Sequence, residues 1–346
     1  MNLLIITRKV DENDSRVGFF NAWLYEFSKR TETLHVIAWQ ESASKELPRN
    51  NIKLIALRGG VVTKIFLLQK HLFFLLRKVD GIFCHMNPEY VILCAPLSKL
   101  FRKKLVCWYT HKTISFRRNI MEVFANTIMT ASKESFREPL YKTKVKIIGH
   151  GVDLRYFTYS KKVLSKNKLT LLTVGRISPT KDIETMILGL SILLKSGVVA
   201  RFNIVGEPAL ASDRVYLNNL KMMVEKLSLK QHVLFPGARA HYLMPQEYKT
   251  ADVFINLSGT ESIDKAVLEA MASGCFVLTS NEAFADVLAK RWMLTRNNPE
   301  NLSEKIKEFI ITPDEEIVNE TERLRQFVEQ EHNLENTVQK IISAFK

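Results

Sequence analysis

A glycine, an arginine and a lysine follow one predicted strand in the second half of the chain. The apolar run near 169–175 ends at Gly175, Arg176 follows it directly, and a helix is expected to start near Thr180 or Lys181. Glycine lets a ligand approach the backbone closely, and the first turn of a helix presents unpaired N–H groups to an anion. A forked guanidinium and a compact ammonium suit a diphosphate. The alternative is that Lys181 is solvated and Arg176 forms a structural ion pair.

A second strand ends in the same way, at Val205-Gly206. This junction is weak by itself, because many α/β proteins place a glycine after a strand. It becomes informative because it is a second loop at the carboxyl edge of the same predicted sheet, where Gly206 would contact the ligand.

Two glutamates eight residues apart mark a third loop. A polar turn after the strand expected over 252–257 carries Glu261, and the following helix carries Glu269 and ends before Gly274. Both carboxylates could accept hydrogen bonds from sugar hydroxyls. The N–H groups of Ser262, Ile263 and Asp264 are expected to open this helix toward an anion. The alternative is that both glutamates are ordinary helix and surface residues.

Short β-rich runs alternate with helical patterns along the whole chain, which predicts parallel sheets with helices on both faces. Strands are expected near 2–7, 33–39, 53–57, 80–84, 104–109, 126–130 and 145–149, then near 169–175, 201–206, 232–236, 252–257, 275–279 and 292–295. Helices are expected near 19–30, 62–78, 88–101, 132–139, 181–196, 213–226, 264–273 and 300–311, with one long amphipathic pattern over 317–345.

The length of 346 residues favours two domains over one. A polar, turn-rich stretch over 149–168 has the composition of a linker. The predicted class is α/β, with two Rossmann-like doubly wound domains that face each other across a cleft. The C-terminal helix is expected to cross back to the N-terminal domain.

Together, these motifs resemble the family 4 retaining glycosyltransferases, also called glycosyl transferases group 1, which have the GT-B fold. The resemblance covers nearly the whole chain. It rests on Gly175-Arg176-x4-Lys181, Val205-Gly206, Glu261-x7-Glu269, Ala270-Met-Ala-x-Gly274 and the crossover-like His150-Gly-Val-Asp153.

The resemblance implies a role for each matching residue. Arg176 and Lys181 would hold the nucleotide diphosphate and stabilise it as it leaves. Glu269 would bind the ribose and Glu261 the donor sugar, while the backbone of Ser262 and Ile263 would touch the sugar or a phosphate.

Further roles follow for the first half of the chain. His111 would lie near the donor sugar, although a structural imidazole is the alternative. Gly18 would lie in the first strand–helix loop, which approaches acceptor and diphosphate. The implied domains are an acceptor-binding domain over 1–155, a nucleotide-sugar domain over 156–320 and a C-terminal helix over 321–346 near their junction.

The resemblance has one clear departure. Ile263-Asp264-Lys265 stands where the family commonly has Phe-Gly-Leu, which places two charges beside the donor pocket. The identity of the sugar therefore cannot be carried over.

The absence of a D-x-D motif predicts a reaction without a metal or cofactor. Fixed cations would stabilise the leaving diphosphate. The donor is expected to be a UDP- or GDP-linked hexose, and the acceptor the hydroxyl of a glycan, a lipid-linked saccharide or a lipid. A nucleotide-sugar epimerase of the same fold and a protein that only binds the donor are the alternatives.

The positive charge lies almost entirely in the first half. Residues 1–150 hold 25 Lys and Arg against 12 Asp and Glu, a net charge of +13, whereas residues 151–346 hold 25 against 24. Such asymmetry favours a polyanionic partner, and the alternative is a surface whose charge only keeps the protein in solution. The apolar, lysine-containing segment 62–78 could lie on an anionic membrane, or it could be a helix packed on a sheet. A nucleic-acid-binding protein is the rival hypothesis, but no motif of that class is present.

Cysteine spacing and the first residues indicate location. Cys84, Cys94, Cys107 and Cys275 lack metal or redox spacing, so buried thiols in a reducing compartment are expected. The first residues do not resemble a secretory signal, and no apolar run approaches the roughly 18 residues of a membrane span. We expect a cytoplasmic protein, with a peripheral position at the inner membrane face as a further expectation.

Overall fold

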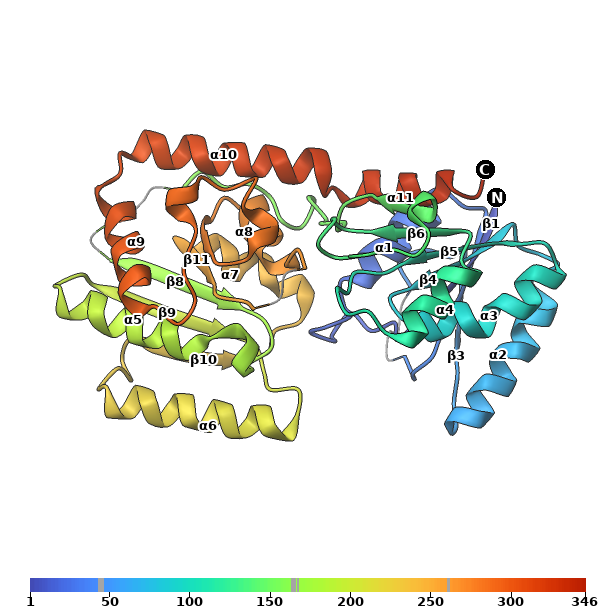
Figure 1. Cartoon of the computed structure of the whole chain (residues 1–346), viewed down its shortest axis with the longest axis horizontal. Helices are drawn as coiled ribbons and strands as arrows, with labels where there is room; N and C mark the ends of the chain where they lie inside the picture. The colour runs from blue at the N-terminus through green and yellow to red at the C-terminus, as the bar shows by residue number, and fades with distance from the viewer. Residues whose placement is uncertain (43–46, 163–165, 167, 260–261) are drawn as a thin grey trace. The chain divides into compact units, whose positions relative to one another are not determined.

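The computed structural model describes residues 1–42, 47–162, 166, 168–259 and 262–346. The chain forms two compact units. Unit 1 consists of Met1–Asp153, Ala240–Tyr242 and His332–Lys346, and unit 2 of Leu154–Arg239 and Leu243–Glu331. Each unit contains one parallel sheet with helices around it (Figure 1), which confirms the predicted α/β class.

The sheet of unit 1 has the strand order β3-β2-β1-β4-β5-β6-β7, with the first strand in the interior of the sheet. Its strands are β1 (Asn2–Thr7), β2 (Thr33–Ala38), β3 (Ile52–Ala56), β4 (Gly81–His85), β5 (Lys104–Trp108), β6 (Thr127–Thr130) and β7 (Val145–Ile147). Its helices are α1 (Phe20–Ser28), α2 (Val61–Leu75), α3 (Pro88–Leu100), α4 (Phe116–Phe124), the 3-10 turn η1 (Lys142–Lys144) and α11 (Leu334–Ser343). Residues 3–6 of β1 are fully buried, as expected for a parallel strand covered on both faces.

The sheet of unit 2 has the order β10-β9-β8-β11-β12. Its strands are β8 (Leu169–Val174), β9 (Ala200–Val205), β10 (Val233–Gly237), β11 (Val253–Asn256) and β12 (Phe276–Thr279). Its helices are α5 (Ile183–Lys195), α6 (Ala211–Lys226), α7 (Met244–Thr250), α8 (Lys265–Ala272), α9 (Pro299–Ile311) and α10 (Asp314–Glu331). Its short 3-10 turns are η2 (Pro179–Lys181), η4 (Glu282–Phe284) and η5 (Lys290–Trp292), whereas η3 (His241–Leu243) begins in the unit 1 segment Ala240–Tyr242 and ends at the first residue of the next unit 2 segment.

Helix α4 was not predicted, because its buried face carries charge. Arg118 and Glu122 are both fully buried and form an ion pair at 3.2 Å, one helical turn apart. Phe136 packs against the Arg118 guanidinium, 4.1 Å from its ring centroid. Ser115 begins the helix by accepting the N–H of Arg118. Met121 is the one apolar residue among the three buried residues of α4, so a pattern of apolar residues could not reveal this helix.

The helix predicted over 132–139 is wrong. Ser132 and Ser135 hydrogen-bond to each other at 3.0 Å, and the Ser132 hydroxyl also accepts the N–H of Ser135. Serine side chains that bond local backbone in this way favour turns over helices. The strand predicted near 292–295 is also wrong, since only an isolated bridge between Thr279 and Met293 forms there.

The long C-terminal pattern is two helices and not one. Helix α10 ends at Glu331, and Asn333 begins α11 by accepting the N–H groups of Glu335 and Asn336. Helix α10 packs on α8 in unit 2, whereas α11 packs on α1 in unit 1.

The cysteine prediction is confirmed in part, because all four thiols are free and buried. Within the described residues, no helix is long and apolar enough to cross a membrane.

His332 joins the C-terminal segment of unit 1 to the end of its first segment, near residue 150. Its Nδ1 accepts the N–H of His150 at 3.1 Å, and its carbonyl accepts the N–H of Val152 at 2.7 Å. Val152 in turn accepts the N–H of Leu334. Burial of the ring, together with the charges of His150 and Lys340, lowers the pKa of His332 to about 3.

This pKa predicts a loss of stability in acid. The unfolded chain takes up a proton on this imidazole near pH 6.5, and the folded chain only near pH 3, so protonation favours unfolding between these values. The contribution of this imidazole to the free energy of unfolding is fully present above pH 6.5. Below that pH it should fall by up to about 1.4 kcal/mol per pH unit. The variant His332→Asn keeps an amide oxygen that can accept the same N–H. Its free energy of unfolding, measured in urea at pH 5, 6 and 7.5, should change less with pH than that of the unaltered chain. An identical pH dependence of the two unfolding free energies would contradict this account.

Candidate functional site

Four loops of unit 2 meet at one edge of its sheet. All five strands are parallel, so the segments after β8, β9, β11 and β12 leave from the same side. The chain runs outward from β8 to β9 and β10, then returns to place β11 on the other side of β8. The strand order reverses between β8 and β11, and this is where open α/β sheets bind ligands.

The loops after β8 and β9 are in backbone contact. The N–H of Gly175 donates to the Val205 carbonyl at 3.0 Å. A Cβ at Gly206 would overlap the carbonyl oxygen of Gly175, and Gly206 has a positive φ of 152°. Glycine is therefore required at 206 for steric reasons, and the predicted pair of glycines does come together.

Lys181 lies beside this pair and is held by an acid from the opposite loop. Its Cε is 3.3 Å from the position that a Cβ of Gly175 would take. Its Nζ is 2.6 Å from Oδ2 of Asp264, which follows β11. Arg176, one residue after Gly175, is exposed. The loops on the two sides of the switch point are also joined by a hydrogen bond from the N–H of Gly259 to the Thr180 carbonyl, at 2.9 Å.

Buried polar residues hold the loop after β11. Asn256 accepts from the Thr279 hydroxyl and donates its amide to Asp264, both at 3.1 Å. Asn281 donates to the Ser262 carbonyl at 2.9 Å. These residues come from the ends of β11 and β12, and sequence reasoning missed them. A polar residue at the end of a buried strand was the available signal.

Glu269 is buried in α8, and both of its carboxylate oxygens have partners. The Tyr248 hydroxyl donates to Oε2 at 3.0 Å, and the ammonium of Lys265 lies 3.3 Å from Oε1. Burial, reinforced by the charge of Glu269, raises the pKa of Tyr248 well above its ordinary value, so the phenol stays a donor. The role of Glu269 in binding ribose stays a prediction.

Neither helix start is open to an anion in the predicted way. Helix α5 begins at Ile183, beyond Lys181, and the N–H of Ile183 already donates to the Tyr216 hydroxyl at 3.2 Å. Helix α8 begins at Lys265, after Ser262 and Ile263, so the N–H groups of these two residues precede the helix.

Asp264 determines where helix α8 begins. Its Oδ1 accepts the N–H of Ala266 at 3.1 Å, so it is the N-cap of α8. Aspartate is among the preferred N-cap residues, and this preference could have identified the cap from the sequence.

The remaining predicted residues are less constrained by the structure. Glu261 lies outside the described residues. In unit 1, His111 is exposed, and its ring packs edge-on against Tyr109 at 5.3 Å. Desolvation of the packed part of the ring lowers the pKa of His111. Gly18 has a structural reason to be glycine, since a Cβ would lie 2.6 Å from the Asp14 carbonyl oxygen. Ligand contacts of these residues stay predictions.

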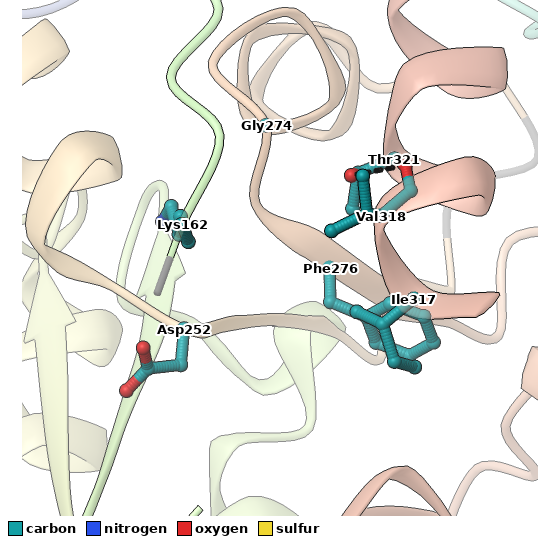
Figure 2. Close-up of a pocket in the computed structure, with 7 residues that line it drawn as sticks. All are labelled: Lys162, Asp252, Gly274, Phe276, Ile317, Val318 and Thr321. Carbon is teal, nitrogen blue, oxygen red and sulfur yellow. Dashed lines mark hydrogen bonds between the residues drawn. The ribbon is translucent and has the colours of Figure 1, made fainter. Parts of the chain in front are cut away.

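A small cavity lies at the opposite edge of the same sheet (Figure 2), near the amino ends of β11 and β12 and beside α10. It is lined by Lys162, Asp252, Gly274, Phe276, Ile317, Val318 and Thr321. Lys162 donates to the Tyr248 carbonyl at 2.9 Å and contacts Cys275 Sγ at 3.3 Å. These contacts fix the start of unit 2 to its sheet, so this cavity has a packing role.

Residues 157–333, just over half of the chain and most of unit 2, match the family described as glycosyl transferases group 1. The chain belongs to this family. The family prediction made from the loops after β8, β9 and β11 is thereby confirmed.

Two relatives show how far the likeness extends. The chain is 29% identical over 162 residues to alpha-monoglucosyldiacylglycerol synthase of Streptococcus pneumoniae, across 43% of this chain and 35% of that protein. It is 34% identical over 106 residues to mannosylfructose-phosphate synthase of Agrobacterium fabrum, across 30% of this chain and 23% of that protein. The matched stretches thus span about a third or less of these relatives.

Solved structures share the fold over nearly the whole chain. HepE of Anabaena, crystallised with UDP and glucose, superposes with a TM-score of 0.78 at 18% identity, covering 99% of each chain. WaaG, a glycosyltransferase involved in lipopolysaccharide biosynthesis, superposes with a TM-score of 0.70 at 14% identity, covering all of both chains. At these identities the likeness concerns the fold, and it agrees with two Rossmann-like domains.

The contact between Gly206 and Gly175 predicts that two glycine-to-alanine substitutions lower the stability by different amounts. Gly206→Ala and Gly197→Ala both place a side chain at positive φ, but nothing lies within 4 Å of a Cβ at Gly197. Gly197→Ala should therefore cost about 1 kcal/mol of backbone strain. Gly206→Ala should cost about 1–3 kcal/mol more, because it must push the Gly175 carbonyl away. Urea unfolding of both variants measures the difference, and equal losses would show that the loops are not in contact.

Proposed function

We propose that the protein transfers a hexose from a UDP- or GDP-linked donor to a hydroxyl of a glycan, a lipid-linked saccharide or a lipid, retaining the anomeric configuration and using no metal ion. The observation that carries the proposal is the loop after β8, where Gly175, Arg176 and Lys181 line the switch point of a parallel sheet. Family membership and the UDP and glucose bound by HepE support it.

In the proposed reaction, the bond between the anomeric carbon and the diphosphate oxygen breaks as the acceptor oxygen forms a new bond on the same face. The acceptor's proton passes to the departing phosphate oxygen. Arg176 and Lys181 stabilise the charge that develops on the diphosphate, which is the role of preorganised donors in a transition state. Glu269 and Glu261 bind hydroxyls of the ribose and of the sugar.

The cations give the first test of the transfer. Arg176→Ala and Lys181→Ala should each lower kcat by ~10²-fold, since each removes a charge that stabilises the leaving group. Lys195→Ala, an exposed lysine at the far end of α5, is the matched control and should leave kcat unchanged.

The donor for this assay is chosen by thermal shift against UDP- and GDP-hexoses, because a ligand that binds only the folded state raises its Tm. Product analysis with and without acceptor distinguishes transfer from epimerisation. Full activity in both loop variants would refute the role of these cations.

We further propose that α2 contacts an anionic membrane, with the protein at the inner membrane face. Val62, Phe66 and Phe73 are 82%, 68% and 40% exposed, and their spacing of four and seven residues places them on one face of the helix. Within α2, only Leu68 and Leu72 are fully buried. Residues 47–79 hold seven Lys and Arg and no Asp or Glu. Apolar side chains surrounded by cations suit a bilayer of anionic lipid.

Vesicle co-sedimentation tests this surface. The protein should bind vesicles that contain phosphatidylglycerol at low salt and should bind pure phosphatidylcholine much less. The double variant Phe66→Ser/Phe73→Ser should bind vesicles about tenfold or more weakly, because two aromatic rings are no longer transferred from water into the bilayer. Ile311→Ser, which changes an exposed apolar residue of α9, serves as the control. Absence of binding, or equal loss in both variants, would count against the membrane surface.

A further inference from the structure

Asp264 brings a negative charge to the place where a diphosphate is expected. Its Oδ2 lies 2.6 Å from the ammonium of Lys181, and the two residues come from the loops on either side of the switch point. Asp264 also occupies the start of α8, because its Oδ1 accepts the N–H of Ala266. One side chain therefore holds both a cation and a helix N–H that a phosphate could otherwise use.

The carboxylate is fixed and charged. Its side chain is 13% exposed, and Asn256 donates a further hydrogen bond to Oδ2 at 3.1 Å. Burial by itself would raise the pKa of Asp264, but the charge and hydrogen bond of Lys181, with the bonds from Ala266 and Asn256, outweigh it and lower the pKa. A carboxylate bonded in this way stays ionised at neutral pH.

We propose that Asp264 is an internal competitor of the donor's diphosphate. It holds Lys181 while the site is empty, and it must share or release the ammonium when a nucleotide binds. This inference rests on the proposed function. Its consequence is that nucleoside diphosphate, the product, is bound weakly and leaves readily.

Two effects weaken binding in the same direction. The diphosphate must break an existing ion pair before it gains Lys181, so part of the new interaction only replaces an old one. The charge of Asp264 also repels the incoming diphosphate at short range. A neutral residue that still caps α8 would remove both effects and leave the helix start intact, since asparagine and serine are good N-caps.

Calorimetric titration with UDP and with GDP tests the proposal directly. Asp264→Asn and Asp264→Ser should each bind the preferred nucleotide about tenfold more tightly than the unaltered chain, equivalent to ~1.4 kcal/mol. The gain should shrink as salt is added, because the interaction is electrostatic. Glu300→Gln removes one exposed acid from the first turn of α9 in the same unit and should leave the Kd unchanged.

The dependence on Lys181 is tested by a double-mutant cycle. If the competition is for this ammonium, Asp264→Asn should tighten binding less in a Lys181→Met background than in the unaltered chain. Equal or weaker nucleotide binding by both Asp264 variants would overturn the inference and leave the donor site standing. Failure of every variant and of the unaltered chain to bind either nucleotide would instead refute the donor site, and this inference with it.

Discussion

The backbone contact between Gly206 and Gly175 is the constraint on which the rest of the candidate site depends. It brings the ends of β8 and β9 together without any side chain between them. The loop after β8 is thereby held by main-chain atoms, and Lys181 is placed beside it. Because the same loop bonds to Gly259, the position of the segment after β11 follows from this contact as well.

Charge in unit 2 is arranged in pairs around that edge. Lys181 faces Asp264, and Lys265 faces Glu269 one turn into α8. Each pair involves one of the two charged residues, Asp264 and Lys265, in the three-residue segment that departs from the family pattern noted from the sequence. The departure noted from the sequence therefore changes the charges at this edge of the sheet, where both residues take part in ion pairs.

Most of the fold could be predicted because parallel strands carry continuous apolar runs, and in unit 2 a glycine directly follows β8 and β9. The strands of both sheets were predicted to within a few residues for this reason. Helix α4 could not be predicted, since its buried residues include Arg118 and Glu122, and only the folded state shows that these two form an ion pair. The break between α10 and α11 was missed because their apolar spacing continues past His332.

The candidate site was predictable in its residue types but not in its pairing. Arg176 and Lys181 stand out from composition and spacing alone. The ion pair of Lys181 with Asp264 joins residues 83 positions apart, and no local pattern records it. Asn256 and Thr279 carried a local signal, as polar residues at the ends of buried strands, but their hydrogen bond joins positions 23 residues apart and could not be read from that signal.

The composition of unit 1 has a consequence for the order in which the protein folds during translation. Residues 332–346 belong to this unit, and Phe345 fills the space beside Gly81 that a larger residue would need. The ribosome makes this segment after all of unit 2, about 180 residues beyond Asp153. Domains usually fold as they emerge, N-terminal part first. Here unit 2 can complete its core while unit 1 still waits for α11, with the surface of α1 uncovered in the meantime.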